Sequence, residues 1–205
     1  MRTWVKICGL TTDEAVDASV EAGADAVGFV LAAGSPRTLQ PSAARLLVGR
    51  VPSSVETVGV FRGQAVAEVV ELARAAGVAT VQLHGDESPG DVATVQAAGF
   101  RVIRAVSVDA YADESEEARR GFREDALLID ALAPGAGAAF DGAPLLAAPP
   151  HRDWILAGGL SPETVAARID ELRPAGVDVS SGVESSRGVK GVGLIRAFVA
   201  AARAG

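Results

Sequence analysis

Short apolar runs alternate along this chain with stretches of helical periodicity. Eight runs are strand candidates: residues 3–8, 25–31, 56–61, 79–83, 102–107, 126–130, 153–157 and 176–180. They are mostly continuous in apolar residues, as strands buried on both faces should be. Between them apolar side chains recur at helical spacing, for example Val66, Val69, Val70 and Ala73. This alternation predicts parallel strands joined by helices.

An Ala-Gly pair separates a predicted helix from the next strand at four places. The four glycines are Gly23, Gly77, Gly99 and Gly176. Glycine commonly ends a helix in the left-handed conformation, and the spacing fits multiples of a unit of about 25 residues. Helix starts are predicted by a capping box at 11–14 and by Pro162 as a first helical residue.

Strand-helix units of this size predict the fold. Eight of them in 205 residues fit a compact (β/α)8 barrel, a TIM barrel, forming a single domain over residues 1–205. A doubly wound open sheet is the alternative. Against it, the first strand ends in Cys8-Gly9-Leu10, with no G-x-G-x-x-G motif. Functional side chains are therefore expected at the carboxyl ends of the strands.

Composition narrows the range of partners. The net charge is −7 and aromatic residues make up 4% of the chain, which argues against a nucleic-acid partner. One cysteine and two histidines predict neither an internal disulfide nor a metal cluster. With no signal-peptide pattern and no apolar run of membrane-spanning length, we expect a soluble, cytoplasmic protein without a membrane partner, and a monomer.

Polar residues end most of the predicted strands. In chain order they include Cys8, Arg37, His84, Asp130, Gly158-Gly159 and Ser180-Ser181-Gly182. Strand alternation places Lys6 and Cys8 on one face, so Cys8 stands at the barrel mouth if Lys6 fills the layer below. Its alternative role is that of a small buried hydrophobic residue. Lys6 and Asp178 lie within buried strands and are expected to form a structural ion pair.

Three of these side chains suit different tasks. Asp130 is either a helix N-cap or a catalytic acid, and the stretch 131–140 shows no helix start, which favours the acid. Arg37 is either an ordinary surface residue or a guanidinium fork for a substrate carboxylate. His84 is expected to line the pocket as a base or a hydrogen-bond donor to substrate.

The glycine and serine pairs that follow strands seven and eight suggest an anion site. TIM barrels commonly bind a phosphate group there, on backbone N–H groups. We therefore expect Gly158, Gly159, Ser181 and Gly182 to bind phosphate, which implies a small phosphorylated substrate. The alternative is that these residues only shape the turns.

Several motifs together carry a family resemblance. They are Lys6-Ile7-Cys8-Gly9-Leu10, Ala24-Asp25-Ala26-Val27-Gly28-Phe29, Ser35-Pro36-Arg37, Val58-Gly59-Val60-Phe61, Val81-Gln82-Leu83-His84-Gly85, Gly158-Gly159-Leu160 and Asp178-Val179-Ser180-Ser181-Gly182-Val183-Glu184. In order and spacing the chain resembles the phosphoribosylanthranilate isomerases of tryptophan biosynthesis along almost its whole length. The resemblance implies an Amadori rearrangement of N-(5-phosphoribosyl)anthranilate, without a metal or organic cofactor.

The resemblance also implies roles for individual residues. Asp130 would be the general acid and Cys8 the general base, while Arg37 would bind the anthranilate carboxylate. One acid and one base suffice, because protonating the ring oxygen opens the furanose to a Schiff base whose C2 proton becomes acidic. The loops after strands seven and eight would bind the phosphate.

The chain departs from the family pattern in two places. The stretch 134–142 lacks the usual hydroxyl and aromatic residues of the strand-six loop, and Arg187 and Gly191 replace a usual proline and a usual acidic residue. These changes are expected to touch substrate affinity more than reaction type. Two other functions remain to be separated: a related sugar-phosphate isomerase or epimerase, and a non-catalytic phosphosugar-binding barrel.

Overall fold

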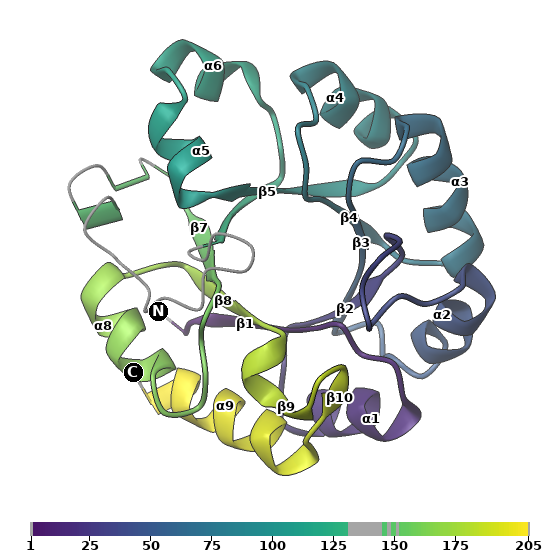
Figure 1. Cartoon of the computed structure of the whole chain (residues 1–205), viewed down its shortest axis with the longest axis vertical. Coiled ribbons are helices and arrows are strands. Elements are labelled where there is room, and N and C mark those ends of the chain that lie inside the picture. Colours follow the sequence, from purple (N-terminus) through teal and green to yellow (C-terminus); the bar gives the residue numbers. More distant parts are fainter. Residues whose placement is uncertain (1, 131–144, 147–148, 151, 205) are drawn as a thin grey trace.

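Eight parallel strands close into a barrel in the computed structural model, which describes residues 2–130, 145–146, 149–150 and 152–204. The strands follow one another around the barrel in chain order (Figure 1). They are β1 (Trp4–Cys8), β2 (Ala26–Val30), β3 (Glu56–Phe61), β4 (Thr80–Leu83), β5 (Arg101–Ser107), β6 (Ala126–Asp130), β7 (Trp154–Ala157) and β8 (Gly176–Val179). Because β1 pairs with both β2 and β8, the TIM barrel is confirmed and the open sheet is excluded.

Helices form an outer ring around the strands (Figure 1). They are α1 (Asp13–Glu21), α2 (Pro41–Val48), α3 (Val66–Ala76), α4 (Pro89–Ala97), α5 (Val108–Asp113), α6 (Glu116–Gly121), α8 (Val165–Leu172) and α9 (Val192–Ala204). After β8 come a 3-10 turn η1 (Ser181–Val183) and a hairpin of β9 (Glu184–Ser186) and β10 (Val189–Lys190). In the described residues, no helix combines the length and apolarity needed to span a membrane.

The predicted glycine stops are correct at three of four places. Gly23, Gly77 and Gly99 have φ angles of 86°, 74° and 96°, in the left-handed region that glycine adopts without a steric penalty. The prediction is wrong for Gly176, which is instead the first residue of β8. There the helix ends earlier, and Arg173 takes the left-handed conformation with φ 52°.

The two predicted helix starts are both displaced. The capping box is wrong, since Thr12 caps α1 by accepting from the Ala15 N–H, and alanine has no side chain to return the hydrogen bond. Pro162 does not begin α8, because residues 162–164 form a turn whose Ser161 carbonyl accepts from the backbone N–H groups of Thr164 and Val165. Both predicted helices are present, and local hydrogen bonding makes each of them start later in the chain than predicted.

The barrel interior is narrow and lined mainly by small or branched residues. A separate apolar cluster fills it: Ala26, Val58, Ile103, Ala105, Leu128, Ile155 and Ala157. Lys6 stands opposite Asp178 in the β1–β8 register, and its fully buried ammonium lies 3.0 Å from the Asp178 carboxylate. The predicted ion pair is therefore confirmed, and it sets the level above which Cys8 opens to the mouth.

Candidate active site

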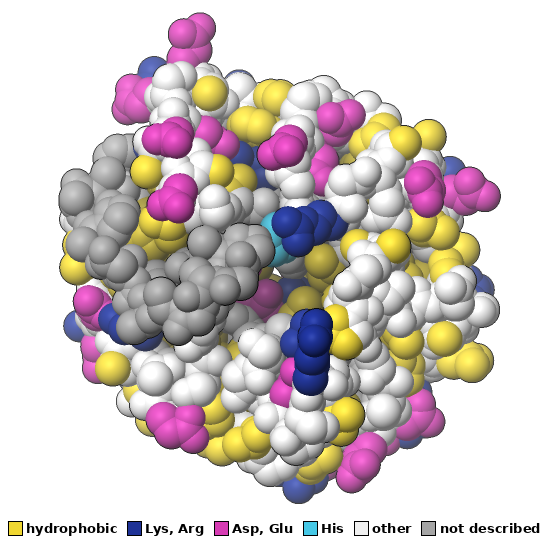
Figure 2. Space-filling view, viewed as in Figure 1, with side chains coloured by type: hydrophobic (Ala, Val, Ile, Leu, Met, Phe, Trp, Pro, Cys, Tyr) yellow, Lys and Arg dark blue, Asp and Glu magenta, His cyan; other side chains and the backbone are white. Residues whose placement is uncertain are grey.

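A pocket of about 500 Å³ opens at the carboxyl ends of the strands, within the usual volume range of small-molecule sites. All of the predicted site residues line it: Cys8, Arg37, His84, Asp130, Gly158, Gly159, Ser181 and Gly182. Cationic side chains and a histidine stand at the rim of the central hollow in Figure 2, although the whole chain is acidic. The structure thus brings residues from six strand ends to one place.

Cys8 lies on the pocket floor with only 7% of its surface exposed. Its neighbour across the β1–β2 pair is Gly28, where an added Cβ would stand 2.8 Å from the Cys8 sulfur. Burial raises the pKa of the Cys8 thiol, while the positive charges of Lys6 and Lys190 act in the opposite direction. Because burial prevails, the thiol is protonated at neutral pH in the ligand-free pocket.

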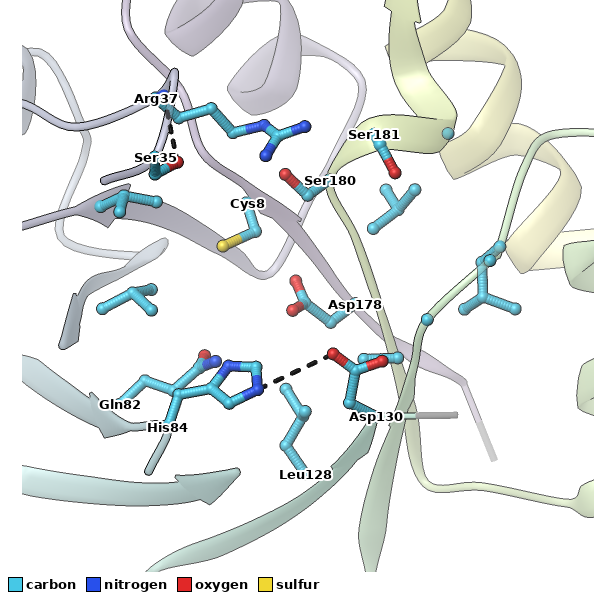
Figure 3. A pocket seen from close by; sticks show the side chains of 18 of the residues that line it. Cys8, Ser35, Arg37, Gln82, His84, Leu128, Asp130, Asp178, Ser180 and Ser181 are labelled. Carbon is cyan, nitrogen blue, oxygen red and sulfur yellow. Dashed lines mark hydrogen bonds and ion pairs between the residues drawn. The ribbon is translucent and has the colours of Figure 1, made fainter. Parts of the chain in front are cut away.

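His84 and Asp130 lie side by side in the pocket, His84 just beyond the end of β4 and Asp130 at the end of β6 (Figure 3). His84 Nε2 lies 3.8 Å from Asp130 Oδ2, and the His84 backbone N–H donates to the Phe61 carbonyl at 3.0 Å. Burial lowers the pKa of His84, with Asp130 opposing the shift. The imidazole is therefore mostly neutral at pH 7, and it has the partner that the sequence did not reveal.

Arg37 projects from the loop after β2 over the pocket, toward Ser180 and Ser181 (Figure 3). Its backbone N–H donates to Ser35 Oγ at 3.1 Å, which anchors the loop. Its side-chain Nε donates to Glu184 Oε1 at 2.5 Å. The guanidinium thus points into the pocket while one of its edges is already bonded.

The loops after β7 and β8 meet at very short range. Gly158 and Gly159 have φ angles of 89° and 64°, which favour glycine. At Gly182 an added Cβ would stand 1.8 Å from the carbonyl oxygen of Leu160, so only glycine permits this contact. Within the described part of the chain, the backbone N–H groups of Gly159, Ser181 and Gly182 have no acceptor, which leaves them available to an anion.

Some pocket residues were not predicted. Gln82 is 2% exposed and lines the floor, two residues before His84 on the same strand face, so strand alternation from His84 would have pointed to it. Asp178 also lines the pocket besides pairing with Lys6. Glu184 contacts Arg37 from outside the pocket lining; it ends the motif 178–184, but its sequence position does not reveal that contact.

The residues that depart from the family pattern lie in different parts of the chain. The stretch 134–142 lies outside the described residues. Arg187 occupies the turn between β9 and β10, and Gly191 directly precedes α9. Neither of the latter two lines the pocket, and their effect on substrate affinity stays a prediction.

Comparison with known proteins matches nearly the whole chain to the family that its sequence motifs resemble. The family model of N-(5′-phosphoribosyl)anthranilate isomerase matches residues 5–201. The enzyme of that name from Chromohalobacter salexigens is 44% identical over 97% of this chain and 93% of its own length. The crystal structure of TrpF from Jonesia denitrificans is 44% identical, with a TM-score of 0.87 over 98% of this chain and 97% of that one.

A further solved structure shows what one relative binds. It is a phosphoribosylanthranilate isomerase in complex with reduced 1-(o-carboxyphenylamino)-1-deoxyribulose 5-phosphate. It is 35% identical to this chain, with a TM-score of 0.83 over 98% of this chain and 99% of that one. Since the family model and the closely similar relatives both cover almost all of the sequence, this chain belongs to the N-(5′-phosphoribosyl)anthranilate isomerase family.

Proposed function

We propose that this chain performs the isomerisation of N-(5′-phosphoribosyl)anthranilate in tryptophan biosynthesis with Asp130 as general acid and Cys8 as general base. The observation that carries the proposal is their convergence: both side chains line one pocket, together with the guanidinium of Arg37 and loops with available N–H groups. Phosphate would bind at Gly158, Gly159, Ser181 and Gly182, and the anthranilate carboxylate at Arg37. His84 would contact the substrate beside Asp130.

The acid and the base each move one proton, at two atoms that are both bonded to C1. Asp130 donates a proton to the ribose ring oxygen, and the C1–O bond breaks as the anilino nitrogen forms an iminium with C1. Cys8, as the thiolate, removes the C2 proton, giving an enol that becomes the ketone when C1 is protonated and the C2 hydroxyl loses its proton. Atoms balance, because the product is an isomer of the substrate, and the mechanism calls for no cofactor.

The local charges explain how Cys8 can act as a base. Burial raises the pKa of its thiol, but the positive charges of Lys6 and Lys190 favour the thiolate. Burial still prevails, so the free thiol is protonated near neutral pH and the thiolate has to form at the moment of reaction. Because the thiol has a raised pKa, its thiolate is a stronger base toward an acidified C–H bond once it forms.

The two charged ends of the substrate each have a matching partner in the pocket. A phosphate matches the backbone N–H groups of the β7 and β8 loops, and a planar carboxylate matches the guanidinium of Arg37. A relative binds a reduced product analogue that carries both groups. The ribose would then lie between Cys8 and Asp130.

A direct assay tests this function. The purified protein should consume N-(5′-phosphoribosyl)anthranilate, followed by loss of its fluorescence, and the Cys8→Ser variant should not. A protein that binds the reduced product analogue tightly yet gives no turnover would be a non-catalytic phosphosugar-binding barrel. Turnover of a different aldose phosphate, with no turnover of this substrate, would indicate a related isomerase.

We also propose that the protein is a cytoplasmic monomer. Among the described residues the large exposed hydrophobic side chains are Leu46, Leu146 and Val189, which belong to separate segments. Such scattered residues are ordinary on a monomer surface. Light scattering after gel filtration should give a mass near 20.8 kDa, and twice that mass would contradict the proposal.

A further inference from the structure

We propose that Glu184 is a positioning residue that holds Arg37 in the orientation needed to bind the substrate carboxylate. The inference rests on the proposed function of Arg37. Glu184 does not line the pocket, so it acts through Arg37 and not by touching substrate.

Glu184 is the centre of three hydrogen bonds. Its Oε1 accepts from Arg37 Nε at 2.5 Å and from Lys190 Nζ at 3.1 Å, and its Oε2 accepts from the Gly188 N–H at 2.9 Å. The carboxylate is 6% exposed. These contacts lower the pKa of Glu184 to about 2, so it is ionised at any working pH.

The contact with Nε determines which edge of Arg37 remains for a ligand. A guanidinium can accept a carboxylate across Nε and one Nη, or across its two Nη atoms. Since Glu184 occupies Nε, the end formed by the two Nη atoms is the one that faces the pocket. We therefore infer that the substrate carboxylate binds end-on at Arg37.

Lys190 prevents Glu184 from cancelling the charge of Arg37. Its side chain is 1% exposed, and its ammonium donates to the Ser180 carbonyl at 2.8 Å, to Ser180 Oγ at 3.1 Å and to Glu184. All three of its donors are thus used. One carboxylate shared between two cations leaves a net positive charge, so Arg37 still attracts an anion.

Close packing fixes the rest of the Arg37 side chain. A Cβ added at Gly9 would stand 2.5 Å from Arg37 Cδ, so the absence of a side chain there makes room for the arginine stem. At Gly188 an added Cβ would stand 3.3 Å from the Pro36 side chain, which places the β9–β10 turn against the Arg37 loop. The stem and the head of Arg37 are both held before substrate arrives.

Two substitutions of Glu184 separate position from charge. E184D keeps the charge but withdraws the carboxylate from Nε, and E184Q keeps an oxygen at that distance without the charge. If position matters, E184D should raise the KM for N-(5′-phosphoribosyl)anthranilate at least about tenfold and E184Q at most about threefold, with kcat within about threefold in both. The reverse order, or equal effects, would overturn the inference.

The effect must also depend on Arg37. In an R37A background neither Glu184 substitution should change KM by more than about twofold, because the group it positions is gone. Additive increases in KM would contradict the inference. E56Q is the matched control, since Glu56 is a partly buried partner of Arg101 at 3.0 Å on the opposite end of the barrel, and it should leave KM unchanged.

Measuring the equilibrium binding of the reduced product analogue distinguishes a failure of this inference from a failure of the proposed function. If the wild-type protein shows no turnover, the proposed function fails, and the same variants are compared by their Kd for the reduced product analogue. By this measure too, E184D should bind the analogue more weakly than E184Q. If all variants bind the analogue as the wild type does, Glu184 is only a structural residue of the β9–β10 hairpin.

Discussion

His84 Nε2 lies 3.8 Å from Asp130 Oδ2, so the two titratable side chains suited to an acid role act as a pair at the pocket mouth. Burial lowers the pKa of His84, which keeps the imidazole neutral. In this form one ring nitrogen carries the single N–H and the other is an acceptor. We propose that His84 orients Asp130 or the substrate and that Asp130 is the general acid.

Asp130→Asn should abolish most turnover while leaving the fold intact. The amide keeps the shape and hydrogen-bonding capacity of the carboxyl but has no transferable proton, so kcat should fall at least about a hundredfold. The Kd for the reduced product analogue should change little. Steady-state kinetics beside thermal melts measure this. Unchanged melting with largely preserved turnover would move the acid role to His84.

Cys8→Ser should lower kcat/KM at least about a hundredfold, since a hydroxyl does not ionise near neutral pH. Melting should be unchanged, because serine fits the same space. In the wild type, kcat/KM should rise as pH increases from 7 toward 9, since burial raises the pKa of the thiol that must be deprotonated. A serine variant with near wild-type kcat/KM would make Cys8 a packing residue.

Gly182→Ala should weaken phosphate binding. Its added Cβ would stand 1.8 Å from the Leu160 carbonyl oxygen, so the β7 and β8 loops must separate and their N–H groups lose a common target. We expect KM to rise at least about tenfold, as loss of hydrogen bonds to a charged group requires. Gly193→Ala is the control, because its Cβ meets nothing within 4 Å. Equal KM values would refute the phosphate assignment.

Lys6→Met should destabilise the protein by about 3–5 kcal/mol, because it leaves the buried carboxylate of Asp178 without its partner. Urea denaturation measures the loss. The double variant Lys6→Met/Asp178→Leu removes both charges and should recover much of the stability. If the single and double variants were equally unstable, packing of the lysine stem would matter more than the ion pair.

Glu184→Gln should flatten the acid side of the stability profile. The folded pKa of Glu184 is about 2, below its ordinary value of 4.5, so its stabilisation is complete above pH 4.5 and is lost as pH falls toward 2. The wild type should lose about 2–3 kcal/mol more than the variant over that interval. Denaturation at pH 6 and pH 3 compares them, and parallel losses would show that Glu184 contributes nothing to the acid transition.

Local patterns were sufficient for the architecture. Continuous apolar runs place the strands within one or two residues, and the alternation of Lys6 and Cys8 correctly puts one in the interior and the other at the mouth. Two helices start later than local patterns predict. Thr12 and Thr164, and not the expected Thr11 and Ser161, directly precede α1 and α8, because neighbouring side chains compete for the same backbone donors.

By itself the sequence determined the barrel, the pocket's place at the carboxyl ends, and the predicted residues from Cys8 to Gly182 that line this pocket, because each depends on periodicity or on residue type at a strand end. Only the tertiary structure decided which side chains contact one another. Glu184 stands 147 positions from Arg37 in the chain, and the contact exists because barrel closure brings the β8 hairpin over the β2 loop. The same holds for the burial that raises the pKa of Cys8, since desolvation depends on all surrounding atoms and on no local pattern.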